Sequence, residues 1–260
     1  MSHHILTVSG LTVRAGRRSL IEDISISVNE GDFIALMGAN GSGKTTLIRA
    51  ILGFVRPYSG EVRLFDSIIN RRNIKGLRSM IGYVPQTLRI DFKMPFLVRE
   101  VVAIGRYGLA GTGRRLTQKD HASIDSALEE IGISHLAERP FGHLSGGERQ
   151  KVQIARAICQ GSHLLFLDEP ANNLDMGAQR DLFDLLSKVN ARGIGVLMVM
   201  HDIHDLPSGV TRAIIISRGR KGFEGPVEDA LKRGPLSLIY GDRTDDVISW
   251  INKRGKGSRS

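Results

Sequence analysis

The sequence predicts an α/β fold in which a core with a parallel sheet carries an N-terminal antiparallel β subdomain and an inserted α-helical subdomain. Three observations lead to this prediction. The first third of the chain contains short β-branched segments, the stretch from about residue 86 to residue 160 has helical periodicity, and apolar strands alternate with a helical segment after Gln160. A chain of 260 residues can bury a substantial apolar core around this arrangement.

The β-rich first third consists of short strands that turns containing Gly or Asn separate. Several of them alternate between apolar and polar residues, which is typical of strands with one buried face. The expected strands cover residues 5–8, 11–13, 24–28, 33–37 and 61–65. This pattern predicts a partly antiparallel sheet.

The middle of the chain predicts helices, and one of them has clear ends. Apolar residues recur there at i, i+3, i+4 and i+7: Ile124, Ala127, Leu128 and Ile131. Thr117 is the expected N-cap with Asp120 three residues later, and Gly132 is the expected stop. We therefore expect a helical subdomain over about residues 86–160.

The last part of the chain alternates between buried strands and a helix. The strands are expected at residues 164–167 and 196–200. The helix between them carries one apolar face: Leu182, Leu185, Leu186 and Val189. Such alternation is typical of a parallel sheet with crossover helices. We assign residues 1–241 to one domain and residues 242–260 to a basic C-terminal tail.

Composition narrows the classes of protein without choosing a partner. The net charge of +9 permits contact with nucleic acid, anionic lipid or nucleotide. Residues 253–259 contain four Lys or Arg side chains and are expected to form a solvated, frayed end. The single cysteine, Cys159, lies in an apolar helical stretch and is expected in the core of a protein from a reducing compartment. No segment has the pattern of a signal peptide or a membrane span, so we expect neither secretion nor membrane crossing.

Residues 38–45, GANGSGKT, match the eight-position phosphate loop, with an apolar strand before them and a helix-compatible stretch after them. Glycines let successive N–H groups point at phosphate oxygens, and the helix N-terminus adds a positive dipole. Lys44 is expected to reach the β- and γ-phosphates, and the Thr45 hydroxyl is expected to bind Mg²⁺. The predicted chemistry is hydrolysis of Mg-ATP. The expected nucleotide contacts in this segment are Gly38, Asn40, Gly41, Ser42, Gly43, Lys44, Thr45 and Thr46.

Two carboxylates, Asp168 and Glu169, end one buried strand, and His201 follows the next. The carboxyl ends of parallel strands are where such sheets bind ligands. We expect Asp168 to hold Mg²⁺, directly or through water, and Glu169 to orient and deprotonate the attacking water. His201 is expected to contact the γ-phosphate or that water.

A second element suits phosphate. Ser145 and Glu148 form a predicted capping box, and Gly146 and Gly147 leave backbone N–H groups unshielded at a positive helix end. One nucleotide loop and two phosphate-facing elements suggest that one of them serves a neighbouring chain.

The segment LSGGERQ, residues 144–150, resembles the signature motif of the ATP-binding subunits of ABC transporters, which have a P-loop NTPase fold with a RecA-like core. The resemblance extends from Ile5 to about Gly241 with the motifs in family order. Residues 38–45 resemble the Walker A loop, Gln86 the Q-loop glutamine, and residues 164–169 the Walker B strand with its catalytic glutamate. Asn173, Leu174 and Asp175 resemble the D-loop, and His201 the switch histidine.

The resemblance implies a head-to-tail dimer or pseudo-dimer in which ATP lies between one subunit's Walker A loop and the signature motif of the other. It makes Gln86 a catalytic residue, a magnesium ligand and a sensor of the membrane partner, and Asp175 a nucleotide-site residue. The implied partners are transmembrane permease subunits and, indirectly, an extracytoplasmic solute-binding protein. The implied place is the cytoplasmic face of the cell membrane, and no nucleic acid is expected.

Residues 94–106 and 168–175 look like those of importers for zinc, manganese or iron, or for metal chelates such as siderophores, haem and cobalamin. This inference rests on likeness alone, because the transported solute passes through other chains. The alternatives are an exporter ATPase, a soluble ABC protein without a transport role, and a module that no longer hydrolyses ATP. Intact Glu169 and His201 argue against the last.

Ala15 stands where many members of the family carry an aromatic ring that stacks on adenine. Two readings stay open at this point. Either Arg14 or Arg17 supplies a guanidinium face for the base, or the base is recognised more weakly.

Overall fold

The computed structural model describes residues 4–86, 95–110, 115–203 and 206–257. Met94, Ser258 and Arg259, which belong to segments discussed above, lie outside the described residues. The chain divides into two compact units. The first contains residues 1–5, 29–31 and 70–198, and the second contains residues 6–28, 32–69 and 199–260.

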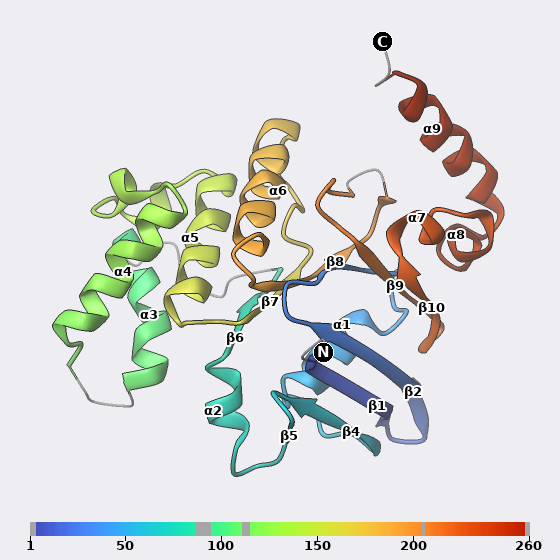
Figure 1. Cartoon of the computed structure of the whole chain (residues 1–260), viewed down its shortest axis with the longest axis horizontal. Helices are drawn as coiled ribbons and strands as arrows, with labels where there is room; N and C mark the ends of the chain where they lie inside the picture. Colours follow the sequence, from blue (N-terminus) through green and yellow to red (C-terminus); the bar gives the residue numbers. More distant parts are fainter. Residues whose placement is uncertain (1–3, 87–94, 111–114, 204–205, 258–260) are drawn as a thin grey trace. The chain divides into compact units, whose positions relative to one another are not determined.

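The second unit contains the antiparallel sheet that the N-terminal third predicts. Its strands are β1 (His4–Ala15), β2 (Arg18–Asn29), β4 (Ser59–Leu64) and β5 (Ser67–Ile68), in the order β2-β1-β4-β5 (Figure 1). β1 and β4 run antiparallel with Leu6 opposite Leu64 and Val8 opposite Val62, and these four side chains are buried. Two predicted segments, 5–8 and 11–13, are parts of the single strand β1.

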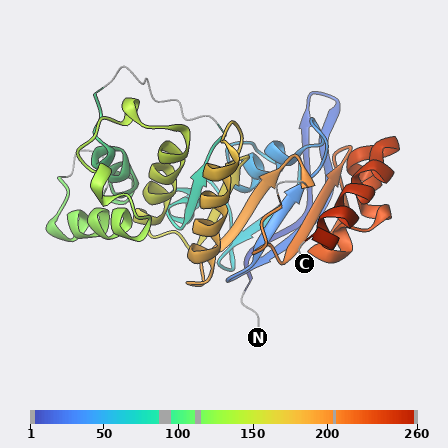
Figure 2. The same cartoon turned by 90° about the horizontal axis from the view of Figure 1, so that it is seen from above.

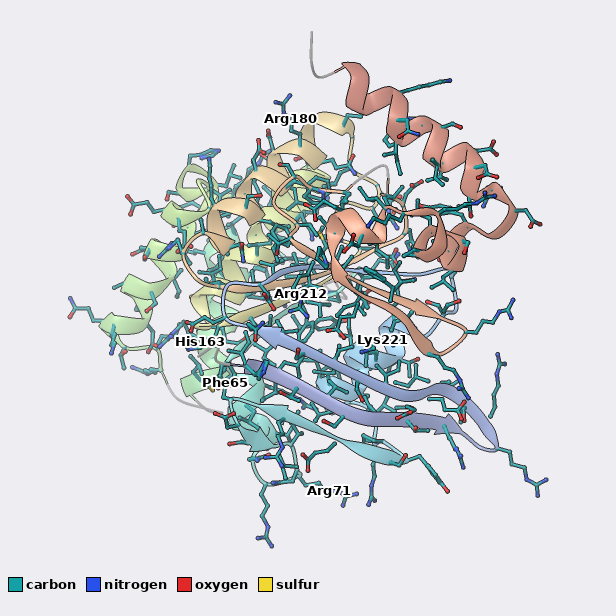
Figure 3. The ribbon with its side chains drawn as sticks, turned by 45° about the vertical axis from the view of Figure 1, so that its right-hand side comes forward. Phe65, Arg71, His163, Arg180, Arg212 and Lys221 are labelled. Atoms are coloured by element: carbon teal, nitrogen blue, oxygen red, sulfur yellow. The ribbon has the colours of Figure 1, made fainter. Side chains whose placement is uncertain are left out.

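The same unit contains a parallel strand pair and a hairpin. β3 (Phe33–Met37) is buried along its length and pairs in parallel with β9 (Arg212–Ser217), which forms an antiparallel hairpin with β10 (Arg220–Pro226). The Arg212 guanidinium forms ion pairs with Asp32 and Glu224, and Lys221 forms an ion pair with Glu224 as well. Figure 3 labels Arg212 and Lys221. The helix α1 (Lys44–Ile51) follows β3 and buries Leu47, Ile48 and Ile51.

The C-terminal part of this unit is helical. It consists of α7 (Val227–Ala230), α8 (Arg233–Tyr240), the short 3₁₀ helix η4 (Gly241–Arg243) and α9 (Thr244–Gly257). Residues 253–257, which the sequence analysis expected to be frayed, are the last turn of α9. Val247 of α9 is buried, and Arg233 of α8 forms an ion pair with Asp245 of α9. These contacts of Val247 and Asp245 are ones that the charge pattern of the tail does not reveal.

The first unit contains the second set of parallel strands. They are β6 (Ile81–Val84), β7 (Leu164–Asp168) and most of β8 (Gly195–Met200), in the order β8-β7-β6. β6 and β7 pair in parallel, with Val84 opposite Leu167. The helix α2 (Ile74–Arg78) precedes β6, and the crossover helix α6 (Met176–Asn190) joins β7 to β8 and buries the predicted apolar face. The α/β class with a parallel-sheet core is confirmed.

The helical subdomain of the first unit contains α3 (Val98–Ala110), α4 (Gln118–Glu130), the 3₁₀ helices η1 (Ser134–Leu136) and η2 (Phe141–His143), and α5 (Gly146–Cys159). α3, α4 and α5 pack against one another, as the green and yellow-green helices of Figure 2 show. Thr117 caps α4 in a capping box with Asp120, as predicted. Arg106 of α3 binds the Asp120 carboxylate at 2.7 Å and donates to the Cys159 carbonyl oxygen at 3.3 Å, so one side chain ties the three helices together.

Two further expectations concern the core and the membrane. Cys159 is buried, as predicted, and burial raises the pKa of its thiol to about 11. Among the described residues, no helix combines the length and the apolar composition that a bilayer span needs.

Candidate nucleotide-binding site

The loop between β3 and α1 has a backbone that only glycine adopts without strain. Gly38, Gly41 and Gly43 have φ values of +150°, +75° and +111°. A Cβ atom on Gly38 would lie 2.2 Å from the carbonyl oxygen of Ile216, and one on Gly43 would lie 2.5 Å from Cγ2 of Ile21. Both contacts are far inside normal van der Waals separation. The close approach of this loop to its own unit therefore requires the predicted glycines.

Lys44 begins α1 and is buried, with 5% of its surface exposed. Its Nζ donates hydrogen bonds to the carbonyl oxygens of Gly38 at 2.7 Å and Ala39 at 3.1 Å, so the side chain folds back across the loop. Ser42 is also buried, and its carbonyl oxygen accepts from the Gly219 N–H at 2.9 Å. A buried cation beside the N-terminus of a helix makes this loop suited to an anion such as a phosphate.

The remaining candidate residues of this segment lie at its surface. Asn40, Gly41 and Thr45 are exposed, and Thr46 is half-buried. Gly43 occupies the N-cap position of α1 and has no side chain to bond to the first turn. No side chain at the N-cap position therefore satisfies the first N–H groups of this helix.

The acids at the end of β7 differ in environment. Asp168 is the last residue of the strand and is 5% exposed, whereas Glu169 is half-buried and has a φ of +53°. A positive φ costs a non-glycine residue conformational energy and is concentrated at functional sites. The structure brings Gln86, the residue that follows Pro85 after β6, to Glu169: its Nε2 donates to Glu169 Oε2 at 2.6 Å.

The sequence analysis did not predict that Asn172 contacts Glu169. Its Nδ2 lies 3.4 Å from Glu169 Oε2, so two amides, from Gln86 and Asn172, flank one carboxylate. The spacing of three residues between Glu169 and Asn172 in a turn is the signal that could have indicated it. Such donors hold the carboxylate in one orientation.

The predicted capping box at α5 is confirmed. Ser145 Oγ accepts from the Glu148 N–H at 3.2 Å, and Glu148 Oε2 accepts from the Ser145 N–H at 2.7 Å. The hydrogen bond from the Ser145 backbone is the main cause that lowers the pKa of Glu148. These bonds satisfy part of the helix end, and the N–H groups of Gly146 and Gly147 belong to its first turn.

The starts of α5 and α6 lie next to each other. Cβ atoms on Gly146 and Gly147 would meet Leu174 at 3.3 Å and Ala178 at 3.1 Å. Asp175 caps α6 by accepting from the Ala178 N–H at 2.8 Å. A cavity of about 660 Å³ opens here, lined by Arg139, His143, Leu144, Ser145, Gly147, Glu148, Lys151, Ala178 and Asp181. Small residues therefore let two helix N-termini share one polar hollow.

His201 follows Met200, the last residue of β8, and is exposed, as expected for a residue after a strand end. Ala15, at the end of β1, is exposed too. The guanidinium of the neighbouring Arg14 lies over the Tyr58 ring, 3.8 Å from its centroid. One face of the Arg14 guanidinium is therefore in contact with the Tyr58 ring. Arg17 is the other candidate for stacking on adenine.

No three His, Cys, Asp or Glu side chains of the described residues group closely enough to hold a metal ion by themselves. The candidate metal ligands are instead the hydroxyl of Thr45, the amide oxygen of Gln86 and the carboxylate of Asp168. All three supply oxygen, the donor that Mg²⁺ prefers, and Mg²⁺ in nucleotide sites takes few protein ligands because phosphates and waters complete its shell. The available donors fit this ion.

The chain resembles known proteins over most of its length. A family model described as ABC transporter matches residues 21–172. The manganese transport system ATP-binding protein MntB of Bacillus subtilis is 34% identical over 236 residues, which cover 91% of this chain and 92% of that protein. The hemin import ATP-binding protein HmuV of Hahella chejuensis is 36% identical over 232 residues, covering 86% and 87% of the two chains.

Solved structures agree with these relatives. The ADP conformation of an ATP-binding cassette of an ABC transporter matches with a TM-score of 0.80 and 26% identity, covering 94% of this chain and 98% of that chain. The phosphate loop with its buried lysine, the acids at the end of β7 and the capped glycine pair of α5 all lie within residues 21–172, which the family model matches. The chain belongs to the ABC transporter family, as one of its ATP-binding, ATP-hydrolysing proteins.

Proposed function

We propose that this ATPase drives the uptake of a metal ion or metal chelate as part of a multi-subunit transporter. The manganese and hemin systems named above support the direction and the class of cargo. The observation that carries the ATPase part is the phosphate loop, in which Gly38 and Gly43 have no room for a Cβ and the buried Lys44 side chain reaches back to the Gly38 carbonyl oxygen. The partners in this proposal are permease subunits at the cytoplasmic face of the membrane and, through them, an extracytoplasmic solute-binding protein.

In the proposed reaction, Lys44 and the N–H groups of residues 38–46 bind the phosphates of ATP. Glu169 orients a water molecule and takes its proton as the water oxygen bonds to the γ-phosphorus; the bond from that phosphorus to the bridging oxygen breaks, and ADP leaves with the bonding electrons. Gln86 and Asn172 hold the Glu169 carboxylate by their amides. His201 contacts the γ-phosphate or the attacking water and stabilises the charge that develops there.

Thr45, Gln86 and Asp168 are the proposed protein ligands of Mg²⁺. These residues supply a hydroxyl, an amide and a carboxylate oxygen, and oxygen is the donor that Mg²⁺ prefers. When bound with ATP, the ion neutralises charge on the β- and γ-phosphate oxygens.

A dimer is proposed because α5 offers a second phosphate-binding end. Ser145, Gly146 and Gly147 would bind the γ-phosphate of an ATP molecule held by the phosphate loop of a second subunit, and Asp175 would lie at the same junction. The cavity of about 660 Å³ at the starts of α5 and α6 supports this role, because a ligand group has room there. Either a second copy or a homologous chain would complete the site.

The first experiment tests whether Glu169 is the general base of ATP hydrolysis. Glu169→Gln keeps the size of the side chain and an oxygen that can accept from Gln86, but an amide cannot take a proton. Since a general base contributes about 10² to 10⁴ in rate, we expect turnover to fall by that factor while ATP binding persists. The variant should also accumulate as an ATP-bridged dimer in size-exclusion chromatography with light scattering. Glu129→Gln, an exposed change on α4, is the matched control and should behave like the parent.

Turnover of Glu169→Gln within a few-fold of the parent would show that Glu169 is not the base. The cargo is tested separately, by purifying the membrane complex that contains this chain and measuring its ATPase rate with Mn²⁺, Zn²⁺, Fe²⁺ or hemin presented on its solute-binding protein. Stimulation by none of these, together with stimulation by an unrelated solute, would contradict the proposed cargo.

A further inference from the structure

The strand β8 ends directly before His201. β8 ends at Met200, and the next residues, Asp202 and Ile203, are not part of a strand or an α-helix. On one side His201 is therefore fixed by the strand. On the other side, the direction of the backbone at His201 depends on the groups that hold Asp202 and Ile203.

Tyr240, from a distant part of the sequence, holds both of these residues. The Ile203 N–H donates to the Tyr240 hydroxyl oxygen at 2.9 Å, and that hydroxyl donates to Asp202 Oδ1 at 3.2 Å. Ile203 is buried and Tyr240 is half-buried. A phenol hydroxyl can accept one hydrogen bond while it donates another, so one atom fixes a backbone group and a side chain at once.

The helix that presents Tyr240 is itself anchored. Tyr240 is the last residue of α8, which lies against the β9–β10 hairpin (Figure 1). Ser217 of β9 donates to the Leu238 carbonyl oxygen at 3.2 Å, and a Cβ atom on Gly222 of β10 would lie 2.6 Å from Leu238 Cδ1. Leu236 of α8 is fully buried. The hydroxyl is thus delivered from a packed element rather than from a loose end.

We infer that Tyr240 is a positioning residue for His201. Through Tyr240, the C-terminal helices set the orientation of the segment that contains His201, Asp202 and Ile203. The inference rests on the proposed role of His201. With the strand at one side and the two hydrogen bonds at the other, the backbone at His201 has little freedom to rotate. Without the hydroxyl, the buried Ile203 N–H loses its acceptor, and the imidazole samples orientations that do not serve hydrolysis.

The test uses the full chain with Tyr240→Phe, which removes only the hydroxyl. We expect kcat for ATP hydrolysis to fall about three- to tenfold, which corresponds to roughly 0.7–1.4 kcal/mol, while KM changes by less than about twofold. The number of ATP sites per chain, from calorimetric titration, should equal that of the parent, which separates misplacement from partial unfolding. Hydrogen exchange at the peptide containing Ile203 should become faster. Tyr107→Phe, which removes a hydroxyl from an exposed residue of α3, is the matched control and should change none of these quantities.

His201→Ala separates the two levels of the argument. If this variant keeps the kcat of the parent, the proposed role of His201 fails and the inference fails with it. If His201→Ala loses activity but Tyr240→Phe keeps kcat within twofold, the inference alone is overturned. A loss of ATP sites in Tyr240→Phe that accounts for its whole loss of rate would likewise overturn positioning, because it would show a purely structural role.

Discussion

Replacing Gly38 by alanine tests the strict geometry of the phosphate loop. The new Cβ would lie 2.2 Å from the Ile216 carbonyl oxygen and 2.7 Å from Ser42 Oγ, at a residue with a φ of +150°. Ile216 cannot retreat easily, because it belongs to β9, which is paired on both sides, with β3 and with β10. The loop must therefore move, and with it the N–H groups and the Lys44 ammonium that are proposed to bind phosphate.

The size of the effect follows from two contributions. A side chain in a backbone region that favours glycine costs of order 1–3 kcal/mol, and forcing an atom into a packed site costs typically about 1–3 kcal/mol. If only about 2 kcal/mol of this total appears as lost ATP affinity, Kd rises roughly 30-fold. We expect at least that increase in calorimetric titration with ATP, in a chain that still folds.

Gly132→Ala is the matched control for backbone strain. Gly132 has a φ of +73° with nothing within 4 Å of its Cβ position, and it follows the end of α4 in the first compact unit, whereas the loop belongs to the second. It should lower the melting temperature slightly and leave ATP affinity unchanged. ATP binding by Gly38→Ala within threefold of the parent, with a melting temperature like that of Gly132→Ala, would refute the reasoning.

Two further predictions concern the helical subdomain. Hydrogen bonds lower the Asp120 pKa from 3.8 to about 2; the largest contributions come from the side chain and backbone of Thr117, followed by the Arg106 side chain. The Asp120 carboxylate therefore stabilises the fold above about pH 4, and this stabilisation is lost as the pH falls toward 2. Asp120→Asn should therefore be less stable than the parent at pH 7 in urea titrations, with a shallower loss of stability between pH 5 and 3; equal pH profiles would contradict this. Burial raises the pKa of Cys159 from 9.0 to about 11, so its thiolate fraction at pH 8 is roughly 100-fold smaller than that of an ordinary thiol, and alkylation by iodoacetamide should be slower in the folded chain by at least that factor. Equal alkylation rates in folded and urea-unfolded chain would show that Cys159 is accessible.

The sequence was most informative where structure depends on neighbours along the chain. The capping boxes at Thr117 and Ser145 were predictable because cap and partner are three residues apart. The phosphate loop was predictable because its conformation requires glycines at fixed spacing. The sequence predicted that the core contains a parallel sheet, but it did not predict β6, β9 and β10. Short apolar runs become strands only through partners far away in the chain.

By itself, the sequence determined which chemical groups are present: a phosphate loop with Lys44, acids at the end of a buried strand, and a glycine pair at a capped helix. Only the tertiary structure decided which distant groups meet. The Gln86 amide contacts Glu169 across 83 residues, and the Tyr240 hydroxyl holds Ile203 across 37. It also buried Val247 and paired Asp245 with Arg233, which no local pattern encodes. The physical reason is that caps and turns are set by local hydrogen bonds, whereas contacts between distant residues depend on how the packed core brings their elements together.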